Sequence, residues 1–199
     1  MLEEGNEFLI VGLGNPGASY EKTRHNAGFC VVEAFGKRHA LPFHPEPAVQ
    51  GRLARGKWRE KELSLLLPST FVNASGKAVQ ACIDAYRIPL DHLMVVSDDV
   101  ALPLGSLRIR SRGSSGGHNG LKSIQECLRT PHYARLKIGV GEKQQESLSE
   151  HVLGRFSEEE WSCLEKVVGQ AIDALETWLT VGIAAAMQQA NAKQGEGNA

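Results

Sequence analysis

The feature that most constrains this fold is a short apolar run that ends in a glycine-rich loop. Residues 8–13 read Phe-Leu-Ile-Val-Gly-Leu, and Gly-Asn-Pro-Gly follows at residues 14–17. An apolar run of this length, closed by turn-forming residues, predicts a buried strand. The loop carries Asn15, and the next helical pattern starts near residue 26, directly after His25. The sequence therefore places an amide and an imidazole beside the end of a buried strand.

Strand and helix patterns alternate along the rest of the chain. This order favours an α/β fold with one twisted, mixed and mostly parallel sheet flanked by helices on both faces. We expect a single domain over residues 1–192 and a frayed tail over 193–199. The proline-rich segment 41–47 should break regular structure, and Ser157 with Glu160 forms a capping box that opens a long helix, which Gly182 bends. The expected strands are 8–13, 48–57, 61–67, 93–96, 107–112 and 136–140. The expected helices are 26–39, 73–86, 119–128 and a long one from 157 through Trp178, followed by a last segment at 183–190.

The glycine spacing Gly12-x-Gly14-x-x-Gly17 matches a dinucleotide-binding fingerprint, but its context does not. That fingerprint needs a helix that starts within the motif and an acidic residue about 20 positions on, at the end of a second strand. Here the helical pattern starts about ten residues late, and Glu33 lies inside that helix. The sequence therefore argues against a nicotinamide enzyme.

Composition places the chain among ordinary globular proteins. Of its 199 residues, 42% are hydrophobic and 23% are charged, and no apolar run is long enough to span a membrane. The first residues resemble neither a signal nor a transit peptide, which predicts a cytoplasmic protein. The four cysteines (Cys30, Cys82, Cys127 and Cys163) are widely spaced on apolar segments, and we expect them to be reduced and buried, with no zinc site.

The net charge of −1 hides a strongly basic segment. Residues 101–137 hold seven basic side chains and one acidic side chain, and a smaller basic cluster covers Arg52 to Lys61. Such runs are usually solvated faces, but two of them in a near-neutral chain favour a polyanionic partner.

Polar side chains gather at the predicted strand ends, in loops and at helix starts. Asp98 follows the strand 93–96, so it should project at the same sheet edge as Asn15, where it could orient His25. The plainer alternatives are a turn or cap role for Asp98 and helix N-caps at Asn73 and Asn119. A serine hydrolase is the other alternative, with Ser75, Ser97, Ser114 or Ser115 as nucleophile. No Gly-x-Ser-x-Gly elbow occurs in the sequence, so a histidine–aspartate pair acting on water is simpler.

These residues stand in an order that resembles the bacterial peptidyl-tRNA hydrolases. The matching motifs cover residues 12–17, Tyr20, 23–28 (Thr-Arg-His-Asn-Ala-Gly), 68–76, 97–99, 116–124 (Gly-Gly-His-Asn-Gly-Leu-Lys-Ser-Ile) and 135–141. The resemblance implies hydrolysis of the ester between a peptide and the 3′ end of tRNA. It implies a monomer without metal or cofactor whose partner is peptidyl-tRNA, and no association with a membrane.

The resemblance also implies roles for individual residues. His25 would be the general base, Asp98 would orient it, and Asn15 would stabilise the oxyanion. Substrate and tRNA would be held by Tyr20, Val72, Asn73 and Asn119, with Arg110 and Lys137 on a tRNA phosphate.

Five positions depart from the common pattern of the family, and one of them is Ser114, which interrupts a glycine pair in the loop. Val72 replaces a usual methionine, Ser97 a frequent histidine, Ala101 a frequent aspartate and Lys137 an arginine. These changes affect substrate affinity more than chemistry. The remaining alternative is a non-catalytic RNA-binding relative, similar to a splicing factor.

Overall fold

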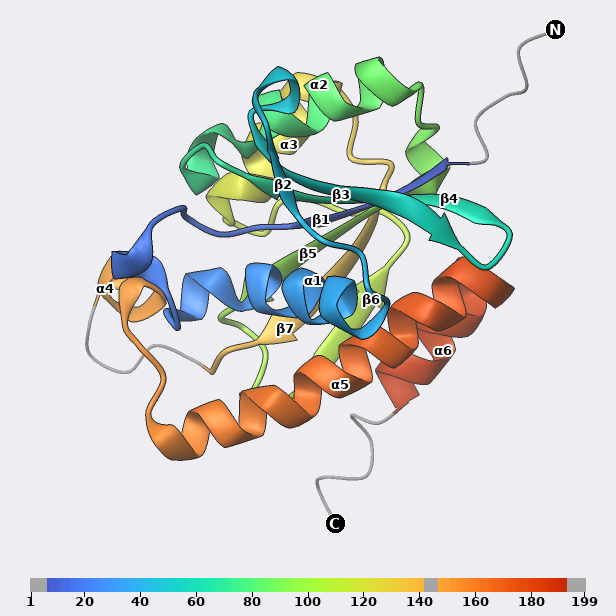
Figure 1. Ribbon diagram of the computed structural model, residues 1–199. Helices are drawn as coiled ribbons and strands as arrows, with labels where there is room; N and C mark the ends of the chain where they lie inside the picture. The colour runs from blue at the N-terminus through green and yellow to red at the C-terminus, as the bar shows by residue number, and fades with distance from the viewer. Residues whose placement is uncertain (1–6, 142–146, 193–199) are drawn as a thin grey trace, which may run out of the picture.

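One seven-stranded sheet organises the chain. The structure is a computed structural model, and it describes residues 7–141 and 147–192. The strand order is β2-β3-β4-β1-β5-β7-β6 (Figure 1). The pairs β4–β1, β1–β5 and β5–β7 are parallel, and β3 and β6 run opposite to the other strands. The strands are β1 Glu7–Gly12, β2 His44–Glu46, β3 Gly51–Trp58, β4 Lys61–Pro68, β5 Leu93–Asp99, β6 Leu107–Arg110 and β7 Ala134–Gly139.

Helices cover both faces of the sheet, as predicted. Figure 1 shows α2 and α3 on one side and α1, α5 and α6 on the other. β1 is fully buried because alternate side chains enter the two cores: Phe8 and Ile10 face α1 and α5, and Leu9 and Val11 face α2. The helices are α1 Ala27–Arg38, α2 Ser75–Tyr86, α3 Asn119–Leu128, α4 Leu148–Leu153, α5 Glu158–Val181 and α6 Ile183–Ala192.

Most predicted elements are present with boundaries shifted by a few residues. The Ser157–Glu160 capping box opens α5, and Gly182, with φ 104°, separates α5 from α6. The prediction for segment 41–47 was wrong, because His44–Glu46 pairs with β3 as a short strand. Pro45 is tolerated there because β2 lies at the sheet edge, where a backbone N–H is dispensable. The sequence analysis missed α4, and the predicted tail 193–199 lies outside the described residues.

The cysteine prediction also needs correction. Cys82 of α2 is buried in the core, but Cys30, Cys127 and Cys163 are only partly buried, and all four are free thiols. Burial raises the pKa of the Cys82 thiol to about 12 and that of Cys30 to about 11, so both stay protonated near neutral pH. Neither thiol is a nucleophile under these conditions.

Candidate active site

The parallel strands bring distant polar residues to one edge of the sheet. Asn15 follows β1 and Asp98 lies near the carboxyl end of β5, next to β1 in the sheet. In the sheet, β1 lies between β4 and β5. The strands that follow β1 in the chain, β2 to β4, lie on one side of it, and β5 to β7 lie on the other. The strand order therefore changes direction at β1, and the carboxyl ends of β1 and β5 flank this point. Open α/β sheets form their ligand sites in such crevices.

A close approach of α1 to the sheet brings His25 to this edge. His25 lies in a short 3₁₀ turn, Arg24–Asn26, that leads into α1. A Cβ atom at Gly28 would lie 2.4 Å from the carbonyl oxygen of Val96, and one at Gly12 would lie 2.6 Å from the carbonyl oxygen of Gly28. Only glycine permits this packing of the first turn of α1 against β1 and β5. The glycine at position 12 therefore serves helix–sheet packing, in agreement with the rejection of a dinucleotide fingerprint.

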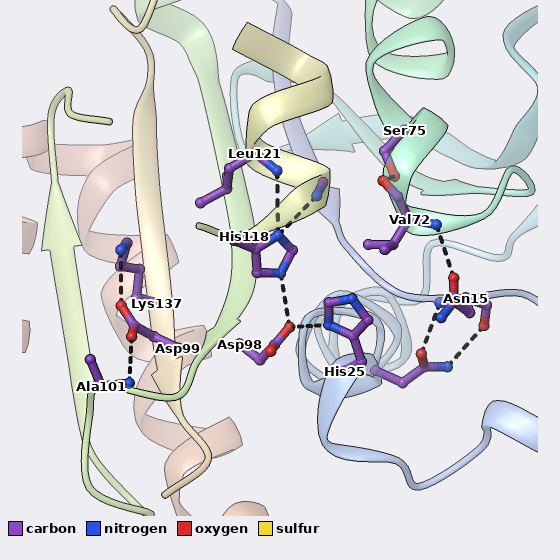
Figure 2. A network of polar contacts seen from close by, with 12 residues as sticks. Asn15, His25, Val72, Ser75, Asp98, Asp99, Ala101, His118, Leu121 and Lys137 are labelled. Carbon is purple, nitrogen blue, oxygen red and sulfur yellow. Dashed lines mark hydrogen bonds and ion pairs between the residues drawn. The ribbon is translucent and has the colours of Figure 1, made fainter. Parts of the chain in front are cut away.

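His25, Asp98 and His118 form a hydrogen-bonded triad (Figure 2). Nδ1 of His25 lies 2.8 Å from Oδ1 of Asp98, and Nε2 of His118 lies 2.9 Å from the same oxygen. Asp98 is 3% exposed and His25 is 8% exposed, so both are shielded from bulk water. The pairing of His25 with Asp98 agrees with the sequence analysis, which overlooked His118.

The surroundings of the triad lower the pKa of Asp98 and raise the pKa of His25. Burial alone would raise the pKa of Asp98, but the hydrogen bonds from His118 and His25 hold it well below its ordinary value. For His25, burial alone would lower the pKa, but the hydrogen bond and the charge of Asp98 raise it above 6.5. Asp98 therefore stays ionised, and His25 is a stronger base than a free imidazole.

Two backbone hydrogen bonds and one side-chain hydrogen bond hold Asn15. Its backbone N–H donates to Oδ1 of Asn26 at 2.8 Å, and Nδ2 of Asn26 donates to the carbonyl oxygen of Asn15 at 3.0 Å. Oδ1 of Asn15 accepts from the backbone N–H of Val72 at 2.9 Å. Because Oδ1 is already bonded, the amide NH₂ of Asn15 is the group that it can offer to a ligand.

A cavity of about 540 Å³ opens above the triad. Its wall carries two exposed apolar side chains, Phe71 at 59% and Leu153 at 42%, which is unusual for groups of this size. Tyr20 is not part of the described lining, but its ring packs edge-on against Phe71 with centroids 6.2 Å apart. The lining comprises Asn15, His25, Phe71, Val72, Asn73, Asp98, Asp99, Val100, Ser115, Gly116, Gly117, His118, Asn119, Lys137, Val152 and Leu153.

Asn73 and Asn119 line this cavity with exposed side chains, and neither is a helix N-cap. Ala74 stands at the N-cap position of α2, and His118 caps α3. The plainer interpretation of both residues as caps was therefore wrong. Both side chains are exposed in the lining of the cavity, where a ligand can reach their amides.

The structure also argues against the serine-hydrolase alternative, because two of its four serines are buried and Ser114 lies outside the cavity lining. Ser75 is fully buried and donates to the carbonyl oxygen of Val72, and Ser97 is fully buried within the sheet. Ser115 reaches the cavity from the loop 113–117, but none of the hydrogen bonds described for the triad involves it. None of the four serines is therefore placed beside His25 as a nucleophile.

Basic side chains alternate on one face of the β6–β7 pair. In the register, Arg110 lies opposite Arg135 and Arg108 lies opposite Lys137. Lys137 lines the cavity, and its Nζ lies 2.9 Å from Oδ2 of Asp99. Arg110 is exposed further along β6, outside the cavity lining.

The structure corrects two parts of the charge analysis. Arg135 is 1% exposed, and its guanidinium binds the carbonyl oxygens of Gly113, Ser114 and Pro131, so it holds the loop rather than contributing surface charge. The smaller cluster is largely neutralised, because Arg52, Arg55 and Lys57 pair with Glu33, Glu7 and Glu62. Of the two basic clusters, the one on β6 and β7 therefore reaches the cavity through Lys137, whereas the smaller one is mostly paired with carboxylates.

Three functional positions escaped the sequence analysis. His118 stands directly before Asn119, and the N-cap preference of asparagine drew the prediction to Asn119 instead. Phe71 and Leu153 give no local signal, because their exposure depends on how the loops around them pack. His25, Asp98 and His118 also bring three potential metal-ligand atoms within 4.8 Å of one another, but these atoms already bind each other at hydrogen-bond distance.

An α/β protein in which a buried aspartate binds a histidine at the floor of an open cleft has an arrangement typical of a hydrolase. The chain belongs to the peptidyl-tRNA hydrolase family, whose profile matches residues 9–197. It is 44% identical over 177 residues to the peptidyl-tRNA hydrolase of Prochlorococcus marinus strain MIT 9515, covering 86% of this chain and 89% of that one. The enzyme of Synechococcus sp. strain CC9311 is 45% identical over 182 residues, which cover 88% of this chain and 87% of the other.

Solved structures give the same result for the fold. The crystal structure of peptidyl-tRNA hydrolase from Acinetobacter baumannii matches with a TM-score of 0.89 at 34% identity, covering 96% of this chain and 98% of that one. In the described parts of the chain, no helix combines the length and the apolar character that crossing a membrane requires.

Proposed function

We propose that this member of the family hydrolyses the ester between a peptide and the 3′ end of tRNA, with His25 as the general base. The contact of His25 Nδ1 with Asp98 Oδ1 at the floor of the cleft carries this proposal. An ionised Asp98 accepts from Nδ1–H, so Nε2 of His25 is the nitrogen left to accept a proton. General base catalysis of this kind contributes about 10²–10⁴-fold to the rate.

The reaction has two proton transfers at His25. Nε2 takes a proton from water as the water oxygen attacks the ester carbonyl, and the resulting imidazolium is stabilised by Asp98. The NH₂ group of Asn15 donates to the oxyanion, since its Oδ1 is held by Val72. His25 then returns the proton to the ribose 3′ oxygen as the ester C–O bond breaks, which releases the peptide acid and tRNA.

The walls of the cavity supply the contacts to substrate. Asn73 and Asn119 offer hydrogen bonds to the peptide backbone and the terminal nucleotide, and Val72 and Tyr20 shape the apolar part of the pocket. Lys137 and Arg110 attract a tRNA phosphate, an interaction that depends on salt and hardly on sequence. Val72 and Lys137 replace a methionine and an arginine, so we expect substrate affinity to differ from that of relatives more than the chemistry does.

The test is release of N-acetyl-amino acid from N-acetyl-aminoacyl-tRNA in the presence of EDTA, with unacetylated aminoacyl-tRNA as control. We expect turnover of the acetylated substrate by the wild-type chain and its near loss in His25→Ala, with tRNA binding retained. Tight binding of tRNA without release would instead indicate the RNA-binding alternative, which the names of the relatives above do not favour.

The proposal includes a monomer that acts in the cytoplasm. One chain supplies every residue of the cleft described above, and peptidyl-tRNA arises where ribosomes work. Light scattering coupled to size-exclusion chromatography tests the first statement, and cell fractionation tests the second.

A further inference from the structure

His118 joins the first turn of α3 to the triad through both of its ring nitrogens. Its Nδ1 lies 3.1 Å from the backbone nitrogen of Gly120 and 3.3 Å from that of Leu121, so it accepts from the N-terminus of the helix. An imidazole nitrogen that accepts two N–H groups carries no proton. The proton of the neutral ring must therefore be on Nε2, which lies 2.9 Å from Oδ1 of Asp98.

We infer that His118 is a positioning residue of the reaction, because α3 fixes its tautomer and its Nε2–H shares with His25 the oxygen that orients the base. The inference rests on the proposed role of His25. The oxygen of the ionised Asp98 accepts both from Nδ1–H of His25 and from Nε2–H of His118. The backbone of α3 thus fixes, through His118, a second donor on the oxygen that orients His25.

Sharing of this oxygen also moderates the basicity of His25. A second donor withdraws part of the negative charge of Asp98, so His25 is held less tightly in its protonated form than it would be by Asp98 alone. The rings of His25 and His118 lie with centroids 5.0 Å apart. Asp98 therefore raises the pKa of His25, and His118 limits this increase.

Other charged groups near His25 are paired with one another. From β5 and β7, Asp99 and Lys137 form an ion pair at 2.9 Å, and Arg24, next to His25 in the chain, binds Glu160 of α5 at 2.7 Å. From α4, His151 binds the carbonyl oxygen of Gly141 at 2.9 Å. Asp98 and His118 are therefore the groups whose change should move the titration of His25 most.

Two substitutions each remove one contact of His118 and keep the other: its hydrogen bond to Asp98, or its cap on α3. Asn at this position places an oxygen near the Nδ1 site and can still cap α3, but it is too short to reach Asp98. Gln places an amide near the Nε2 site and can still donate to Asp98, but it lacks the capping atom. We expect His118→Asn to move the acid limb of kcat/KM to higher pH at a nearly wild-type Tm, and His118→Gln to keep the limb in place at a lower Tm.

The opposite pattern, or a pH profile that neither variant moves, would reduce His118 to a helix cap and overturn the inference. A second measurement needs no turnover, so it also separates a failure of this inference from a failure of the proposed function. In ¹⁵N NMR spectra of the wild-type chain at pH 8, His118 should show the Nε2–H tautomer and His25 the Nδ1–H tautomer. A proton on Nδ1 of His118 would overturn the inference even in an active enzyme.

Discussion

Asn26 binds the backbone of Asn15 through both ends of its side-chain amide, at 2.8 Å and 3.0 Å. This pair of hydrogen bonds closes the loop between β1 and α1 and fixes the direction of the Asn15 side chain. Asn26 is buried and belongs to the same turn as His25. One residue thus fixes the position of the proposed oxyanion donor, Asn15, relative to the proposed base, His25.

Replacement of Asn26 by Ala should therefore damage both stability and rate. Loss of two buried hydrogen bonds should lower the free energy of unfolding by about 2 kcal/mol, and a freed Asn15 should lower kcat more than it raises KM. Asn191 offers a matched control, because its amide makes the same two bonds with the backbone of Ile109, far from the cleft. Asn191→Ala should lose similar stability in urea unfolding and keep kcat, and equal losses of kcat in both variants would contradict this role of Asn26.

The pKa of His25 predicts the acid limb of the pH profile. Only neutral His25 accepts a proton, and its pKa is raised above 6.5, so kcat/KM should rise with pH to a plateau with its midpoint above that value. In Asp98→Asn, the charge is lost and burial dominates, so the midpoint should move to lower pH while the plateau falls by roughly 10²-fold or more. A midpoint that stays in place in this variant would show that Asp98 does not act on His25. Stopped-time assays from pH 5 to 9 measure both quantities.

The basic face of β6 and β7 should control the salt dependence of tRNA binding. Arg110→Ala combined with Lys137→Ala should weaken binding and reduce the slope of log K against log salt by about 2, one for each lost phosphate contact. Lys57 and Arg59 are a matched pair of exposed basic residues near the amino end of β4, at the sheet edge opposite to the cleft. Their double alanine variant should keep the wild-type slope, and equal slopes in both double variants would place the phosphate contact elsewhere.

The ion pair of Lys137 with Asp99 competes with a phosphate for the same ammonium group. In Asp99→Asn, the amide oxygen can still accept from the backbone of Ala101, a bond of 2.9 Å in the wild type, while the competing charge is removed. We expect deacylated tRNA to inhibit this variant at lower concentration, with a steeper dependence on salt. Inhibition that is unchanged or weaker would mean that Asp99 supports the lysine rather than competes with the ligand.

Two glycines should respond in opposite directions to replacement by Ala. At Gly28 the added Cβ would meet the carbonyl oxygen of Val96 at 2.4 Å, so the variant should unfold at lower denaturant concentration and lose activity as α1 shifts. At Gly169, inside α5, no atom lies within 4 Å of the added Cβ, and the gain in helix propensity should stabilise the chain by about 1 kcal/mol. Normal activity and stability in Gly28→Ala would show that the contact between α1 and the sheet is not required to place His25.

Much of the fold follows from local patterns in the sequence. The apolar run 8–13, the capping box at Ser157 and the polar residues after strands depend on neighbours within a few positions, so the order of elements and the edge that carries the site were predictable. The pairing of His25 with Asp98 was also predictable, because parallel strands end at a common edge. β2 was missed because it is short and contains Pro45. α4 was missed because it has only six residues, although Ser147 and Glu150 form a capping box at its start.

What the sequence by itself determined is the α/β architecture and the inventory of polar groups at one sheet edge. Only the tertiary structure decided which of those groups share a proton or a charge: His118 on Asp98, Asn26 on Asn15 and Asp99 on Lys137. The tertiary structure also shows that Arg135, expected on the surface, is buried and binds carbonyl oxygens at the loop 113–117. The physical reason is the sequence distance over which each interaction acts. Turn and helix preferences depend on neighbours within a few residues. The hydrogen bonds named here join residues 11 to 38 positions apart, so they depend on strand register and on where the helices pack.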